Sequence, residues 1–204
     1  MAEMKWTLKE VIQETDHPFL NFYTLVYDVE KKDGHHTYSY YMSSRRTKEE
    51  LVCKTHQFSK PDGVLIPLYL NDPKTGKLSL IITHQFRPPL NNYVNSFPAG
   101  LIDGDEDLKL AATREAREEV GADIADIEVL ATASPTSSGM SDEMNAVVLA
   151  RVTGFEDREL EEFEDIGFDI VPLDKMEEYT STHFFALQIR MIIKYLLERF
   201  KGQY

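Results

Sequence analysis

The sequence has a single cysteine, Cys53, among its 204 residues. One cysteine cannot form an internal disulfide, which fits a protein of the reducing cytosol. Long apolar runs are also missing, since no uninterrupted stretch approaches the roughly 18 residues needed to span a bilayer. Residues 1–10 carry mixed charges and contain no apolar signal region. We therefore expect a cytoplasmic protein that is neither secreted nor inserted in a membrane.

Positive charge is scarce as well. The chain has 22 Lys and Arg against 35 Asp and Glu, which gives a formal net charge of −13. Such an acidic surface repels a nucleic-acid backbone, so binding to nucleic acid is not expected. The same surface would repel a small anionic substrate. If the substrate is a diphosphate, cations must reverse the local field, and a bound divalent metal ion is the economical way to do this.

The chain shows neither an internal repeat nor a low-complexity linker. Residues 21–29 and 37–42 are rich in aromatic and β-branched residues and flank a turn that contains Gly34, which predicts a β-hairpin. We expect residues 1–62 to form a β-rich extension that is too small to fold alone. This extension should pack on the main domain, residues 63–204, or on a second subunit.

The main domain alternates strand and helix patterns. A helix is predicted over residues 107–120, with Gly121 just beyond its end, and a last helix over residues 184–200, capped by Ser181 or Thr182. The other expected elements are a short helix at 47–52 and strands at 63–70, 78–85, 127–134, 144–152 and 165–171. Strands interleaved with two main helices indicate a mixed α/β or α+β sandwich.

The helix over residues 107–120 carries Glu115, Glu118 and Glu119 on one sector of its surface. A solvated acidic face is the ordinary interpretation of such a pattern. However, like charges three and four residues apart repel, and the helix dipole disfavours negative charge in the last turns. A hard divalent cation would remove this repulsion by taking several carboxylate oxygens at once. Because Arg114 and Arg117 offset part of the charge, the helix alone leaves both interpretations open.

The spacing around this helix decides between them. Residues 100–122 read GLIDGDEDLKLAATREAREEVGA. This segment resembles the Nudix box, Gly-x5-Glu-x7-Arg-Glu-U-x-Glu-Glu-x-Gly-U, in which U is an apolar residue, and every fixed position matches. The chain is therefore identified as a member of the Nudix hydrolase superfamily. The resemblance implies an α/β/α sandwich with a mixed β-sheet, to which the β-rich N-terminal extension is added.

The resemblance also implies roles for the acidic residues of the box. Glu115, Glu118 and Glu119 would ligate Mg²⁺, with the main-chain carbonyl of Ala99 contributing and Mn²⁺ as a possible replacement. Glu115 and Glu119 are accordingly expected in the catalytic centre.

Other positions of the box have structural roles by the same resemblance. Glu106 would pair with Arg114 and orient the helix. Gly100 and Gly121 would permit the loop geometry at the two ends of the helix.

Outside the box, three segments resemble those of ADP-ribose pyrophosphatases. They are Gln85–Pro89 (QFRPP), Phe97–Asp103 (FPAGLID) and the loop Ser134–Glu143 (SPTSSGMSDE). Arg87 is the residue expected to bind a phosphate, because a guanidinium matches phosphate geometry with two parallel hydrogen bonds. In the loop, Pro135, Gly139 and Glu143 are expected to contact the substrate. Pro135 could also be a simple turn former.

A general base is still needed, and in similar enzymes it often lies on a loop before a late strand. Here the acidic run at residues 159–165 holds this place, and Glu162 or Glu164 would be the base. One position departs from the family pattern. Ser96 stands where ADP-ribose pyrophosphatases usually have a Glu that helps to hold the substrate. The substrate could therefore be a nucleotide sugar other than ADP-ribose.

The predicted activity is the Mg²⁺-dependent hydrolysis of the diphosphate bond of a nucleoside diphosphate sugar, with ADP-ribose giving AMP and ribose 5-phosphate. Three alternatives stay open. The substrate could be a dinucleoside polyphosphate, coenzyme A or a nucleoside triphosphate; the chain could bind ADP-ribose without cleaving it; or it could be a scaffold for protein partners. Enzymes of this kind are commonly homodimers, and the aromatic hairpin in residues 1–62 is the expected interface.

Overall fold

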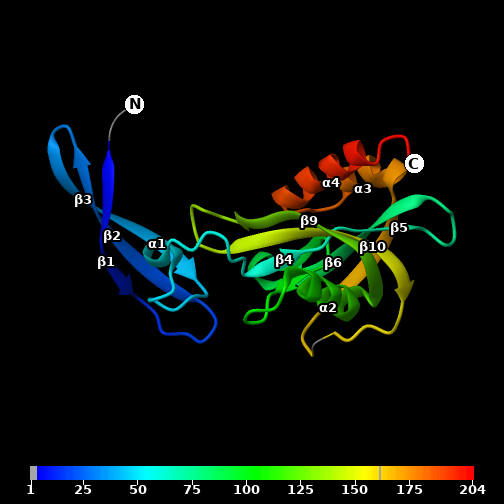
Figure 1. Ribbon diagram of the computed structural model, residues 1–204, viewed down its shortest axis with the longest axis horizontal. Coiled ribbons are helices and arrows are strands. Elements are labelled where there is room, and N and C mark those ends of the chain that lie inside the picture. Colours follow the sequence, from blue (N-terminus) through cyan, green and yellow to red (C-terminus); the bar gives the residue numbers. More distant parts are fainter. Residues whose placement is uncertain (1–3, 161) are drawn as a thin grey trace. The chain divides into compact units, whose positions relative to one another are not determined.

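The computed structural model describes residues 4–160 and 162–204. The chain divides into two compact units (Figure 1). The first contains the residues up to Asp62 together with Ala133–Asn145, and the second contains Gly63–Thr132 and Ala146–Tyr204. No helix in the described part of the chain is long and apolar enough to cross a bilayer.

The first unit is built on a three-stranded antiparallel sheet in the order β1-β2-β3. Its strands are β1 (Lys5–Gln13), β2 (Asn21–Lys31) and β3 (Gly34–Ser44), and a one-turn helix, α1 (Val52–Thr55), follows. The predicted hairpin is confirmed, whereas β1 was not predicted because its residues alternate with charged ones. One sheet face buries an apolar cluster: Val11, Tyr23, Leu25, Met42 and Leu51. The helix expected at residues 47–52 is wrong, since α1 begins only at Val52.

The second unit contains a mixed sheet. The strands of this sheet are β4 (Gly63–Leu65), β5 (Leu68–Asn71), β6 (Leu78–Arg87), β7 (Asn92–Ser96), β8 (Ala99–Leu101), β9 (Ala122–Pro135), β10 (Met144–Phe155) and β11 (Ile166–Pro172). Its main path runs β11-β6-β5-β10-β4-β8, with β7 beside β6 and β9 beside β10. The β5–β10 pair is parallel, whereas β6 pairs antiparallel with β5, β7 and β11.

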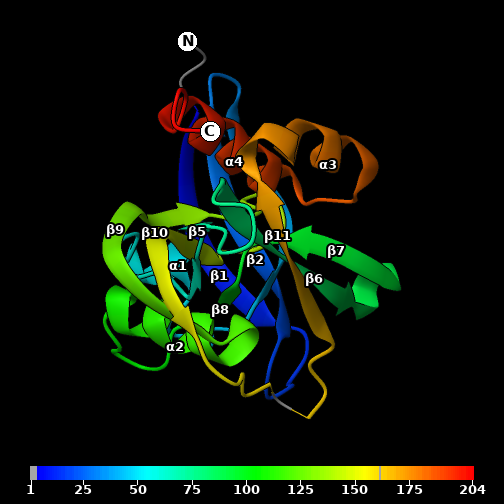
Figure 2. The same ribbon diagram turned by 90° about the vertical axis from the view of Figure 1, so that its right-hand side faces the viewer.

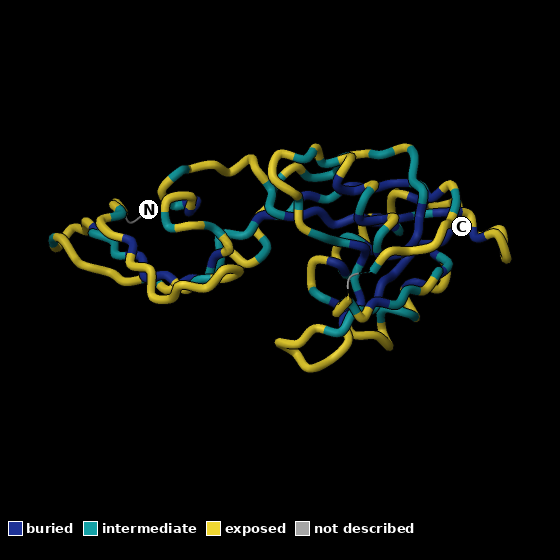
Figure 3. The backbone as a smooth tube through the Cα atoms, turned by 90° about the horizontal axis from the view of Figure 1, so that it is seen from below, coloured by how far each residue is buried: buried dark blue, intermediate teal, exposed yellow. Residues whose placement is uncertain are grey.

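Helices cover both faces of this sheet (Figure 2). These are α2 (Leu108–Val120) on one face, and α3 (Met176–Thr182) and α4 (Leu187–Arg199) on the other. Alternate strand residues point to opposite faces, so Ile81 and Val148 pack in the α2 layer while Leu80 and Leu149 pack in the α3/α4 layer. In Figure 3 the buried stretches of this unit lie mostly in its interior. The predicted α/β/α sandwich is therefore confirmed.

The ends of α2 agree with the sequence. The Asp107 side chain accepts a hydrogen bond from the backbone N–H of Lys109 at 2.9 Å and caps the first turn. Gly121 ends the helix in the left-handed conformation, with φ of 69°.

Other boundaries differ from expectation. The strand predicted over residues 63–70 divides into β4 and β5, because Pro67 has no N–H to donate between them. The last helix starts at Leu187, with Ala186 at its N-cap and no capping side chain. The hydroxyl groups of Ser181 and Thr182 instead bond to the carbonyl of Glu178 within the separate helix α3.

Small residues let α2 lie close to the sheet. Ala111, Ala112 and Ala116 are completely buried. We predict that Ala116→Leu lowers the free energy of unfolding by about 1–3 kcal/mol, because a larger side chain overfills a packed layer. Leu110→Ala is the matched control on the same helix, since Leu110 is 63% exposed and should change stability by no more than about 0.5 kcal/mol. Urea unfolding measures both, and equal stabilities of the Ala116→Leu variant and the wild type would contradict this packing account.

Candidate active site

A cavity of about 450 Å³ lies in the second unit beside the C-terminal half of α2. Its lining residues come from five segments: Gln85 and Arg87 from β6; Ala99, Gly100 and Leu101 from β8; Asp103 from the loop before α2; Arg114, Glu115, Glu118 and Glu119 from α2; and Glu159 and Glu164 from the segment before β11. Six of these residues are acidic and two are basic. The cavity therefore suits a charged ligand together with a cation.

Two of the α2 glutamates are buried, which is unusual for acids. Glu115 is 8% exposed and Glu119 is 4% exposed. The Glu119 carboxylate accepts a hydrogen bond from the backbone N–H of Ala99 at 3.3 Å. A Cβ atom at Gly100 would overlap the Glu115 carboxylate, so any other residue here would force that side chain to move. β8 and α2 are thus shaped around two carboxylates.

Arg114 holds three carboxylates at once. Its Nη1 donates to Glu115 Oε1 at 2.7 Å and to Glu118 Oε2 at 3.0 Å. Its Nε and Nη2 donate to the two oxygens of Glu106 at 3.3 and 3.0 Å, and Nη2 also donates to the Leu101 carbonyl at 3.0 Å. The structure therefore places Arg114 beside Glu106, as the sequence led us to expect. In addition, Arg114 neutralises part of the acidic cluster.

The expected metal ligands fit a divalent cation by their chemistry. Glu115, Glu118, Glu119 and the carbonyl of Ala99 offer hard oxygen ligands around one cavity, as Mg²⁺ prefers. No three acidic, histidine or cysteine side chains among the described residues already converge as a metal-binding group. Glu115 and Glu118 instead bond to Arg114 in this conformation. A cation would have to take these carboxylates from the guanidinium.

The pKa values of the buried acids show the cost of their charge. Burial raises the pKa of Glu119 to about 8; the charges of Glu115 and Glu164 add to the effect, and the Arg87 charge opposes it. Burial also raises the pKa of Glu115, against the hydrogen bond from Arg114, which lowers it. Ionising several acids that raise one another's pKa costs free energy, and a cation bound between them lowers that cost.

Arg87, at the end of β6, is the second basic residue of the cavity after Arg114. Gln85 and Arg87 are two residues apart at the end of β6, so both project to the same side. Both line the cavity. Arg87 is exposed and close enough for its charge to lower the pKa of Glu119. Gln85 was not singled out from the sequence, although its spacing from Arg87 on a strand was the available signal.

The structure separates the two residues considered for the general base. Glu164 lines the cavity, and its charge raises the pKa of both Glu115 and Glu119. Glu162 is exposed and is not among the lining residues. Glu159 lines the cavity too, and its backbone N–H donates to the Glu118 carbonyl at 3.2 Å. Within the acidic run, Glu161 lies outside the described residues.

Three predicted substrate residues belong to the first unit rather than to this cavity. Pro135 ends β9. The carbonyl of Gly139 accepts a hydrogen bond from the Tyr40 hydroxyl at 2.9 Å. The carboxylate of Glu143 accepts one from Thr136 at 2.8 Å. The part of these residues in binding substrate stays a prediction.

Without metal, the stability of the protein should depend on pH through Glu119. The folded state keeps the Glu119 proton up to about pH 8, whereas the unfolded state loses it near pH 4.3. Stability therefore falls as pH rises through this window, by an amount on the order of a few kcal/mol. Glu119→Gln should flatten this decline in metal-free urea unfolding at pH 5, 6.5 and 8.

The matched control is Glu118→Gln on the same helix, because the Glu118 side chain is 38% exposed and remains hydrated. This variant should keep the wild-type decline with pH. If the Glu119→Gln variant loses stability between pH 5 and pH 8 as steeply as the wild type, the decline with pH does not come from ionisation of the buried Glu119 carboxyl.

Comparisons with known proteins point to one family. The family model for the NUDIX domain matches residues 59–189. An ADP-ribose pyrophosphatase of Bacillus subtilis is 32% identical over 157 residues, which cover 76% of this chain and 78% of that protein. An ADP-ribose pyrophosphatase of Saccharomyces cerevisiae is 42% identical over 59 residues, 29% of this chain and 25% of its own length. A putative nudix hydrolase of Caenorhabditis elegans is 32% identical over 104 residues, 48% of this chain and 46% of its own. The chain thus spans less than half the length of the latter two relatives.

The fold is shared with a solved structure described as an ADP compounds hydrolase. It superposes with a TM-score of 0.71 over 98% of this chain and 96% of that one, at 21% identity. At this identity the likeness speaks for the fold alone. Nudix hydrolases generally use divalent metal ions, which agrees with the oxygen ligands around the cavity. On the family-model match and the Bacillus subtilis relative, this chain belongs to the Nudix hydrolase family.

Proposed function

We propose that this chain hydrolyses the diphosphate bond of a nucleoside diphosphate sugar, with ADP-ribose as the leading substrate and Mg²⁺ as the metal. The observation that carries the proposal is the gathering of the box glutamates, Arg87 and Glu164 around one cavity. Relatives in Bacillus subtilis and Saccharomyces cerevisiae that bear the name ADP-ribose pyrophosphatase support the choice of substrate. Mn²⁺ would be the natural replacement for Mg²⁺, since both prefer oxygen ligands.

In this proposal Glu115, Glu118, Glu119 and the carbonyl of Ala99 hold the metal. When bound, the metal neutralises the diphosphate and lowers the pKa of a coordinated water. The neighbouring Arg87 binds a phosphate oxygen by two charge-assisted hydrogen bonds and fixes the orientation of the diphosphate. A cavity with six acids cannot accept a dianion unless cations are supplied. Arg114 already bonds to carboxylates, which leaves Arg87 as the lining arginine that can bind the phosphate.

Glu164 is the general base of this proposal. It takes a proton from the attacking water as the new P–O bond forms and the bridging P–O bond breaks. With ADP-ribose the products are AMP and ribose 5-phosphate. Its place at the cavity supports Glu164 over Glu162, which is exposed. Glu106 and Arg114 keep the structural role of orienting α2 by their paired contacts.

Three residues of the first unit, Pro135, Gly139 and Glu143, are further substrate contacts in this proposal. Their assignment rests on the resemblance of Ser134–Glu143 to the corresponding segment of ADP-ribose pyrophosphatases. Residues 1–62 would form the homodimer interface. Exposed aromatic side chains in this segment, such as Trp6 and Tyr41, would lie in that interface.

A substrate panel tests the proposed function. The panel contains ADP-ribose, other nucleoside diphosphate sugars, a dinucleoside polyphosphate, coenzyme A and nucleoside triphosphates, each with Mg²⁺ and with product identification. ADP-ribose should have the highest kcat/KM and yield AMP. If only another class on the panel turns over, the substrate assignment is wrong. Binding of ADP-ribose without turnover of any compound would make the chain a non-catalytic binding protein.

Two neighbouring glutamates give a matched test of the base. We predict that Glu164→Gln lowers kcat by at least about 100-fold, because proton transfer by a positioned base contributes about 10²–10⁴-fold. Glu162→Gln should leave kcat within about twofold, since its exposed side chain stays in water. Rates measured at saturating ADP-ribose and Mg²⁺ settle the matter, and the reverse ranking of the two variants would move the base to Glu162.

The proposed dimer is tested at the stacked pair Phe22 and Tyr41. Their ring planes are nearly parallel at 3°, and the side chains are 44% and 61% exposed. Light scattering should give a dimer for the wild type. Replacement of both residues by Ser should shift the protein toward monomer, because buried aromatic anchors dominate protein interfaces. A monomeric wild type at micromolar concentration would refute the dimer.

A further inference from the structure

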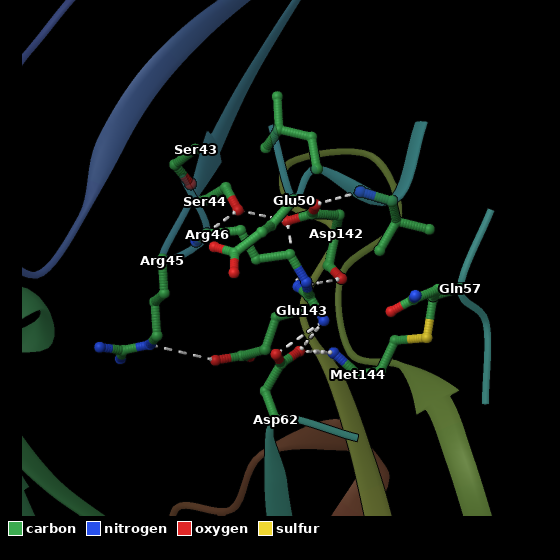
Figure 4. Close-up of polar contacts among 12 residues, drawn as sticks. Ser43, Ser44, Arg45, Arg46, Glu50, Gln57, Asp62, Asp142, Glu143 and Met144 are labelled. Carbon is green, nitrogen blue, oxygen red and sulfur yellow. Dashed lines mark hydrogen bonds and ion pairs between the residues drawn. The ribbon is translucent and has the colours of Figure 1, made fainter. Parts of the chain in front are cut away.

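A buried ionic network lies in the first unit, outside the cavity described above (Figure 4). The Arg46 guanidinium bonds both carboxylate oxygens of Asp62, at 2.6 and 2.8 Å. It also donates to the main-chain carbonyl of Asp142 at 3.0 Å and lies 3.5 Å from its carboxylate. The side chains of Arg46, Asp62 and Asp142 are only 15%, 21% and 11% exposed.

Neutral donors stabilise the excess negative charge in this network. One guanidinium faces two carboxylates, so one negative charge is left over. The Ser44 hydroxyl donates to one oxygen of Asp142 at 2.6 Å, and the backbone N–H of Val52 donates to the other at 3.0 Å. The backbone N–H of Met144 donates to Asp62 at 2.8 Å. Every carboxylate oxygen of the two aspartates thus has a partner, which a buried charge requires.

The network joins segments that are far apart in the sequence. Ser44 ends β3 and Arg46 follows it, Val52 begins α1, Asp62 precedes β4, and Asp142 belongs to the loop before β10. Arg46 is itself held in place, because its carbonyl accepts a hydrogen bond from the fully buried Tyr23. Arg46 is therefore held at its backbone by Tyr23 and at its guanidinium by Asp62 and Asp142, so this one side chain can fix the position of the loop.

The loop that this network holds, residues 136–143, carries two of the predicted substrate residues, Gly139 and Glu143. The Ser43 N–H donates to the Met140 carbonyl at 2.9 Å, which adds a backbone contact between β3 and the loop. A cavity of about 170 Å³ opens beside the network, and Arg46, Asp142 and Glu143 are among its lining residues. The position of Glu143 in this cavity therefore depends on the attachment of the residue before it.

We propose that Arg46 is a positioning residue for substrate binding: through Asp62 and Asp142 it holds loop 136–143 in the one conformation that contacts the substrate. This inference rests on the proposed function, since it presumes that the loop contacts the substrate. Apolar side chains could stabilise the same region equally well. What a guanidinium with fixed donor directions adds is the selection of a single loop conformation.

The test compares Arg46→Lys with a matched control, Arg151→Lys. Lysine keeps the charge at position 46 but cannot bond Asp62 and Asp142 in the same planar geometry. Arg151 pairs with Asp126 at 2.6 Å at an exposed position of the second unit, and its side chain is 43% exposed. Both full-length variants are assayed with ADP-ribose and Mg²⁺ well below their unfolding temperatures, so that loss of folded protein does not enter.

For Arg46→Lys we expect KM to rise about tenfold, equivalent to about 1.4 kcal/mol, while kcat stays within about twofold. Backbone hydrogen exchange at Val52 and Met144 should become about tenfold faster or more, because both amides bond to the clamped aspartates. Arg151→Lys should change none of these quantities. A merely structural Arg46 would shift the unfolding temperature without changing KM.

Unchanged KM in Arg46→Lys, or a loss confined to kcat, would overturn the inference, and so would unchanged hydrogen exchange at the two amides. These outcomes leave the proposed function intact, since the wild type would still hydrolyse ADP-ribose in the same assay. A wild type that turns over no nucleoside diphosphate sugar would instead refute the proposed function and, with it, the role of the loop in substrate binding. The exchange measurement still reports separately whether Arg46 fastens the loop.

Discussion

The burial of negative charge at one end of α2 is the constraint on which the site depends. Glu115 and Glu119 are among the few charged residues in the buried set, and the raised pKa of each records the free energy that their ionisation costs. An apolar core gains nothing from such groups. Their presence makes sense if a cation joins them, and Arg114 shows how one positive group already satisfies part of the cluster.

The surrounding fold keeps these carboxylates in place. Alanines on the inner face of α2 let the helix approach the sheet, and Gly100 leaves the space that the Glu115 carboxylate fills. The pairing of β6 with β11 then brings the end of β6 and the segment before β11 to the same cavity, so that Arg87 and Glu164 line it with the α2 acids. Residues packed around a buried carboxylate must either be small enough to leave room for it or form a hydrogen bond or ion pair with it.

The sequence predicted α2 and its acidic face well, because the box has a fixed spacing and a helix repeats every 3.6 residues. It did less well where distant partners decide the structure. β1 was missed because charged residues obscure its strand pattern, and it is its pairing with β2 that makes it a strand. Ser181 and Thr182 were wrongly predicted to cap the last helix, because they belong to the separate helix α3. Glu162 and Glu164 could not be ranked from an acidic run, since their difference lies in three-dimensional exposure. Nothing in the local pattern marks Arg46, whose partners are 16 and 96 residues away.

The most direct test of the central claim is the proton count on Mg²⁺ binding, measured by titration calorimetry at pH 7 in buffers of different ionisation enthalpy. A carboxyl with a pKa of about 8 is mostly protonated at pH 7 and must lose its proton to bind a cation. The account predicts release of about one proton per binding event in the wild type, and none with weakened binding in Glu119→Gln. Mg²⁺ binding of equal affinity in both proteins, without proton release, would contradict it.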